Sequence, residues 1–141
     1  MKTKLILTSI IVLLCLQSKS YGVISYQVSW LARESATTYA GRRDINGNTV
    51  YILETQPNFT LSSFRKATHK FVRVHERRNR NLRLEQDWTR TLQGYACIIR
   101  LQSHYRMILV YYPSKGEIHI MGVMDEDPFN DILKEMLPWL N

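Results

Sequence analysis

The side chains best suited to catalysis are Cys97, one of the two cysteines of the sequence, and the four histidines. A cysteine nucleophile lies in an exposed, electropositive place and needs a base beside it, which a histidine can supply. Cys97 instead lies within the apolar run Tyr-Ala-Cys-Ile-Ile, where a small buried residue is expected. We therefore interpret Cys97 as a core residue, which makes a small Cys-dependent hydrolase the least favoured function class. The candidate bases are His69, His75, His104 and His119.

The histidines and carboxylates do not show the spacing of a metal site. In the hairpin register expected for the last two strands, His119 faces Val110 while His104 lies beyond the other end. The carboxylate cluster at 125–127 lacks the alternating oxygen ligands and the glycine of a calcium loop, and acidic residues at the start of a helix explain it better. Since no Gly-rich phosphate loop or nucleophile elbow is present either, the sequence predicts no metal, no cofactor and no catalytic residue.

Positive charge is concentrated in one predicted helix and the turn after it. The partner of such a surface would be anionic: an acidic protein, a phospholipid head group or lipopolysaccharide. The alternative is a solvated helix face, partly neutralised by Glu76, Glu85 and Asp87. A nucleic acid is not favoured, because Phe64 and Phe71 belong to the apolar stripe of the helix and are not exposed among the arginines. The candidate partner-binding residues are Arg65, Lys66, Lys70, Arg73, Arg77, Arg78, Arg80 and Arg83.

The helix that carries these cations is expected from residue 58 to about residue 76. Apolar residues such as Phe64 and Phe71 recur there at three- and four-residue steps, with basic residues between them. This amphipathic pattern predicts a helix that lies on a sheet. The candidate N-caps are Asn58, Thr60 and Ser62.

Strands are expected before this helix. Val23 to Leu31 alternates loosely and predicts a first strand, and residues 32–41 predict a loop or a weak edge strand. Asn46-Gly47 predicts a tight hairpin turn, because both residues tolerate positive φ. Residues 49–54 follow as a strand rich in β-branched and aromatic residues.

Four more strands and a second helix are expected after the basic stretch. Residues 82–93 alternate, with Leu84 and Trp88 on one face, Glu85 and Asp87 on the other, and a bulge expected near Trp88. The later elements are interior strands at 95–102 and 107–112, a hairpin turn at 113–116, a strand at 117–124 and a helix at 127–140. The sequence thus predicts a single α+β domain, a mostly antiparallel sheet with a central helix and a C-terminal helix in an α/β/α sandwich.

The first twenty residues have the three-part pattern of a secretory signal peptide: a basic start, an apolar stretch at 5–16 and a polar end. About a dozen apolar residues are fewer than the roughly 20 that span a membrane. Cleavage is expected after Ser20 or Gly22, which leaves residues 21–141 as one domain. Three of the 19 basic residues leave with the signal, so the formal net charge falls from +7 to +4.

Cysteine use favours a bacterial periplasm. Cys15 leaves with the predicted signal, so Cys97 is the only thiol of the mature chain and no internal disulfide can form. In a eukaryotic host, Asn58-Phe-Thr60 would be a glycosylation acceptor.

The order of elements resembles that of the PsbP-like and DcrB-like proteins. The resemblance covers roughly residues 50–140 and is carried by Thr91-Leu-Gln-Gly-Tyr-Ala96, Lys115-Gly-Glu-Ile-His-Ile120 and Asp127-Pro-Phe-Asn-Asp-Ile-Leu133. The basic central helix and the Pro138-Trp139 ending depart from the family. The resemblance implies an α/β/α sandwich and a non-catalytic accessory or binding role at an envelope, with no catalytic residues to carry over.

The function that these patterns favour is a secreted or periplasmic binding or accessory protein without catalytic activity. Its partner would be a protein or an anionic envelope surface, contacted through the basic helix face or a sheet edge. The alternative is an immunity or inhibitor protein that docks onto a toxin or enzyme.

Overall fold

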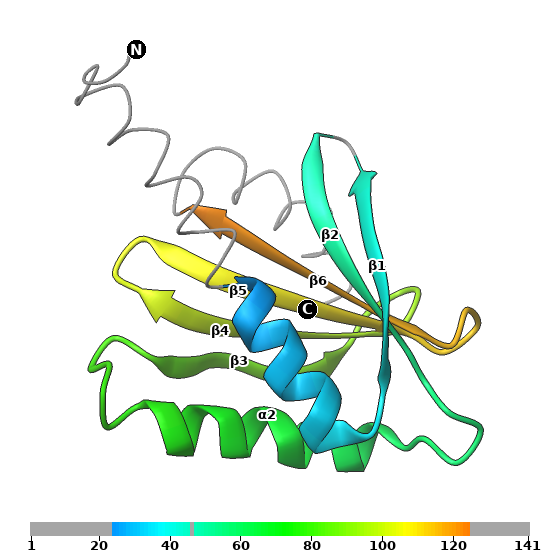
Figure 1. The fold of residues 1–141 in the computed structure, drawn as a ribbon, viewed down its shortest axis with the longest axis horizontal. Helices are drawn as coiled ribbons and strands as arrows, with labels where there is room; N and C mark the ends of the chain where they lie inside the picture. Colours follow the sequence, from blue (N-terminus) through cyan, green and yellow to red (C-terminus); the bar gives the residue numbers. More distant parts are fainter. Residues whose placement is uncertain (1–23, 46, 125–141) are drawn as a thin grey trace.

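The computed structural model describes residues 24–45 and 47–124. These residues form two helices and one six-stranded antiparallel sheet, and both helices pack on the same face of the sheet (Figure 1). The predicted α+β class is confirmed. The predicted signal peptide and the predicted helix at 127–140, which would supply the third layer of the sandwich, lie outside the described residues.

Residues 24–35 form a helix, so the prediction of a strand at Val23–Leu31 is wrong. Ile24, Val28 and Leu31 are buried, whereas Tyr26 is exposed. The buried positions are spaced by four and three residues, which is the helical period, and the loose alternation together with the β-favouring Val, Tyr and Trp side chains obscured it. This helix lies beside the basic helix, with the rings of Trp30 and Phe71 in contact.

The hairpin after this helix has the predicted turn. Strand β1 (Thr38–Ile45) pairs antiparallel with β2 (Asn48–Glu54), and Ile45 lies opposite Asn48. Gly47 has a φ of 80°, the left-handed conformation that glycine adopts at little cost. β1 begins at Thr38, so the segment predicted as a loop or weak edge strand contains the first part of an edge strand that is exposed along most of its length.

The basic helix is α2, Leu61–His75. Of the three candidate caps, Thr60 is the N-cap, and its side-chain oxygen accepts a hydrogen bond from the Ser63 amide at 3.2 Å. Its inward stripe is buried, which confirms the predicted amphipathic helix; the buried residues are Phe64, Ala67, Thr68 and Phe71.

The four strands after α2 form an antiparallel meander. They are β3 (Arg83–Arg90), β4 (Tyr95–Gln102), β5 (Tyr105–Tyr112) and β6 (Glu117–Met124). The order in the sheet is β1-β2-β6-β5-β4-β3, so β4 and β5 are interior strands, as predicted. The predicted β5–β6 register is confirmed, because His119 lies opposite Val110 and Met121 opposite Ile108.

Apolar side chains fill both faces of the sheet. The main core lies between the sheet and the two helices, and it includes Cys97, Met107 and Leu109, each fully buried. A smaller cluster on the opposite face contains Ile98 and Ile108. Since neighbouring side chains of a strand point to opposite faces, the alternation of Cys97 and Ile98 between the two clusters fixes which face each strand position occupies.

Candidate functional site: the basic face of α2

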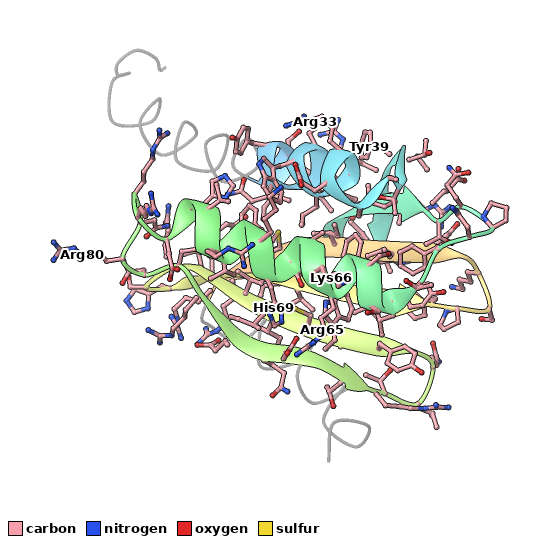
Figure 2. The ribbon with its side chains drawn as sticks, turned by 90° about the horizontal axis from the view of Figure 1, so that it is seen from below. Arg33, Tyr39, Arg65, Lys66, His69 and Arg80 are labelled. Atoms are coloured by element: carbon pink, nitrogen blue, oxygen red, sulfur yellow. The ribbon has the colours of Figure 1, made fainter. Side chains whose placement is uncertain are left out.

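All eight predicted partner-binding cations are exposed and lie on α2, on the turn after it or at the start of β3. The residues on α2 point outward because its inward positions are occupied by Phe64, Phe71 and their neighbours. Figure 2 shows Lys66 on the outer surface of α2, Arg65 on the side toward β3, and Arg80 projecting from the end of the molecule. We call this surface the basic face; it consists of Arg65, Lys66, Lys70, Arg73, Arg77, Arg78 and Arg80.

Two members of the basic face have an acidic partner. Arg65 pairs with Asp87 at 2.8 Å, and Lys70 pairs with Glu34 of the first helix at 2.8 Å. These pairs fix cations on both flanks of α2, toward β3 and toward the first helix.

The eighth predicted cation, Arg83, is not part of this face. Its neighbours Leu82 and Leu84 pack into the core beneath α2, so Arg83 points to the other face of the sheet. There it lies 3.9 Å from Glu85, at the limit of an ion pair.

The other five members of the basic face form no ion pair with any residue in the described part of the chain. Glu76, predicted to neutralise them in part, forms no ion pair within residues 24–45 and 47–124 either. The surface is therefore only partly neutralised. The five residues are Lys66, Arg73, Arg77, Arg78 and Arg80.

Asp87 organises the β3 side of the basic face. One of its oxygens accepts hydrogen bonds from Arg65, at 2.8 and 3.1 Å, and the other accepts from the Trp88 amide at 2.7 Å and lies 3.1 Å from Nε2 of His69. Burial alone would raise the pKa of Asp87, but the hydrogen bonds from Arg65, His69 and the amide outweigh it and lower the pKa to about 2. The carboxylate is thus ionised, so His69 donates its Nε2 proton to it.

The sequence pattern placed Asp87 on the wrong face of β3. Strict alternation puts Glu85 and Asp87 on the same side, but the register of β3 against β4 shifts between Leu84 and Gln86 and again between Gln86 and Thr89. These irregularities, at the bulge predicted near Trp88, turn Asp87 toward α2. Leu92, near the end of the strand predicted at 82–93, lies beyond the end of β3 and is 72% exposed.

Glu85 belongs to the opposite face of the sheet. It pairs with Arg100 at 2.7 Å and with Arg106, and partial burial, which would raise its pKa, is outweighed by these hydrogen bonds, so the pKa is lowered. On that same face Glu117 pairs with Arg43 at 3.2 Å. Arginines on the opposite face therefore have acidic partners, in contrast to five of the seven members of the basic face.

An open depression of about 400 Å³ lies on the outer side of α2. Four members of the basic face contribute to its walls, and His69 is the fifth contributor. Figure 2 shows Arg65 and His69 on the same side of the helix. The sequence analysis did not include His69 among the partner-binding residues, although its position one helical turn after Arg65 places the two side chains together. The described residues that line the depression are Arg65, Lys66, His69, Lys70 and Arg73.

Cys97 has none of the properties of a nucleophile. Its side chain is fully buried in strand β4, and this burial, with a smaller contribution from the charge of Asp87, raises the pKa of the thiol well above its ordinary value. The histidines are dispersed: His75 bonds the Phe71 carbonyl at 2.8 Å, and His119 lies against Glu117 at 2.9 Å. Among the described residues no group of three His, Cys, Asp or Glu side chains could hold a metal ion.

Neither helix in the described ranges has the length and apolar character needed to cross a membrane. Comparison of the chain with protein-family models, with curated proteins and with solved structures finds no match. The resemblance to the PsbP-like and DcrB-like proteins therefore stays a prediction.

Proposed function

We propose that the protein is a secreted or periplasmic, non-catalytic binding or accessory protein that contacts an anionic partner, a protein or an envelope surface, through the basic face of α2. The observation that supports this most is the set of five exposed cations with no acidic partner among the described residues. The predicted signal peptide supports the location, since it would direct the chain out of the cytoplasm.

The arrangement of charge within α2 is unfavourable for the isolated protein. Lys66 and Lys70 are four residues apart, Lys70 and Arg73 are three apart, and like charges at these spacings destabilise a helix by a few tenths of a kcal/mol. The first turn of α2 contains no acidic residue that would favour the helix dipole. Stability alone does not account for this charge distribution, whereas an anionic partner would relieve the repulsion.

The proposal is tested by neutralising the surface without disturbing internal contacts. In one variant Arg73, Arg77 and Arg78, which have no partner in the described part of the chain, are replaced by Gln. The matched control replaces three cations elsewhere, Arg42, Arg90 and Lys115, with Gln, so that both variants have the same net charge. Binding is measured to polyglutamate and to phosphatidylcholine vesicles with and without phosphatidylglycerol.

We expect the wild type and the control variant to bind at least one anionic probe, and the α2 variant to lose most of this binding. Binding should weaken steadily as salt rises from about 0.1 M to about 1 M, because the Debye length falls from roughly 10 Å to 3 Å. Equal loss in both variants would mean attraction to net charge alone. That result, or binding that is independent of salt, would contradict a contact through the basic face.

A further inference from the structure

The depression on α2 has an excess of positive charge that its own surroundings do not neutralise. Its four cations face two carboxylates, Asp87 from β3 and Glu34 from the first helix, which leaves a net charge of +2 without counting His69. Both carboxylates already accept hydrogen bonds from the basic face. The excess matches a ligand with two negative charges.

The depression also has hydrogen-bond donors that are not used inside the protein. Arg65 donates to Asp87 through Nε and one terminal nitrogen, and its other terminal nitrogen has no hydrogen bond among the described residues. His69 directs Nε2 at Asp87, and its Nδ1 has no partner in residues 24–45 or 47–124. Lys66 and Arg73 add unpaired charged donors. Asp87 thus fixes two side chains of the site, while Lys66 and Arg73 can adjust to a ligand.

We propose that this depression binds a phosphate monoester. Such a group has a charge of about −1.5 to −2 at pH 7 and three strongly accepting oxygens, which match the excess charge and the several N–H donors that line the depression. A single carboxylate of an acidic peptide has one charge and two oxygens, so it would leave donors of the depression unused. The assignment rests on the proposal that the basic face is the binding surface, and it narrows the partner to a phosphorylated one.

Lys66 and Arg73 are the residues to change, because neither forms an ion pair with a described residue that its loss would break. Lys66→Gln and Arg73→Gln are compared with Arg42→Gln, which removes one exposed cation of strand β1, outside the basic face. Circular dichroism checks that each variant is folded. Binding of inorganic phosphate to the whole chain is measured by calorimetry and by amide NMR shifts at constant ionic strength.

We expect saturable binding of phosphate by the wild type and by Arg42→Gln. Loss of one charge-assisted hydrogen bond should weaken it by roughly tenfold or more in Lys66→Gln and Arg73→Gln. Vesicles with phosphatidic acid, which has a monoester phosphate, are compared with phosphatidylglycerol vesicles of equal charge. Preference for phosphatidic acid would identify a lipid head group as the source of the phosphate, and binding of free phosphate alone would identify a soluble phosphorylated ligand; both support the site.

The phosphate site is overturned if the wild type binds neither inorganic phosphate nor phosphatidic acid in preference to phosphatidylglycerol. Equal weakening by Arg42→Gln and Lys66→Gln would overturn it too, since it indicates diffuse attraction. In either case, loss of polyglutamate or phosphatidylglycerol binding in the Arg73, Arg77 and Arg78 variant would still support the basic face as the binding surface. Failure of the narrower assignment is therefore distinguishable from failure of the proposed function.

Discussion

Asp87 is the residue on which the β3 side of the basic face depends. It holds Arg65 at 2.8 Å and His69 at 3.1 Å, and the Asp87 hydrogen bond raises the pKa of Arg65 in return. Without this carboxylate the two side chains would lose their fixed positions beside the depression. An acidic residue thus contributes to an anion-binding surface by orienting the hydrogen-bond donors of that surface.

The Asp87 carboxyl should titrate at about pH 2, below its ordinary value of 3.8. Because its folded-state pKa is the lower one, its contribution to stability is present above pH 3.8 and is lost as the pH falls toward 2. The stability difference between the wild type and Asp87→Asn should therefore shrink over that interval. Carboxyl-detected NMR measures the midpoint, and Arg65→Gln should raise it; an unchanged midpoint in that variant would show that Arg65 does not hold the carboxylate.

Cys97 should resist thiol reagents in the folded protein. Its side chain is fully buried and its pKa is raised by burial, so both access and thiolate fraction are low. Labelling with a maleimide should proceed only as fast as the protein opens or unfolds, and addition of denaturant should accelerate the labelling. Rapid labelling of the native chain would contradict this burial and would support a Cys-dependent hydrolase.

Among the helices and strands, the spacing of apolar residues predicted the structure correctly where the pattern was extended and regular. The α2 pattern from Phe64 to Phe71 predicted its helix, and Asn46-Gly47 predicted the first hairpin turn. The helix at 24–35 was missed because β-branched and aromatic residues in it favour a strand when only local preference is considered. Its helical form depends on tertiary packing, in which Trp30 contacts Phe71 with ring centroids 5.5 Å apart.

The turn between β3 and β4 depends on a glycine that packs against the backbone. A Cβ at Gly94 would lie 1.9 Å from the carbonyl oxygen of Tyr111 in β5. Gly94→Ala should therefore destabilise the fold by about 1–3 kcal/mol or more, as overpacking does. Urea unfolding measures this cost, with the exposed neighbour Gln93→Ala as control at under about 0.5 kcal/mol. Equal stability of the two variants would contradict this close approach.

For the whole molecule, stability and binding are located in different places. Leu109→Ala should lower the free energy of unfolding by on the order of 2–5 kcal/mol, because Leu109 is fully buried in the core of the sheet. Arg78→Ala should cost under about 0.5 kcal/mol, as expected for an exposed residue with no partner in the described part of the chain. Chemical denaturation compares the two, and similar costs would show that the core is wrongly placed.

The sequence predicted the seven cations of the basic face but not how they are held. Runs of Lys and Arg are visible in any sequence, so these residues could be named in advance, whereas Arg83 lies on the other face of the sheet. The pairing of Lys70 with Glu34, and of Arg65 with Asp87, joins residues 36 and 22 positions apart. These contacts depend on the misread first helix and on the irregular register of β3, which strict periodicity does not represent.

The most direct test of the basic face is to map the contact itself. Amide NMR shifts of the labelled whole chain are recorded while polyglutamate is added, and the perturbed amides are placed on the structure. We predict that the largest shifts fall on the outer residues of α2 and on the turn at 76–81, and that the edge strand β1 stays unchanged. Shifts concentrated on β1, or spread evenly over the surface, would contradict the assignment of the basic face as the binding surface.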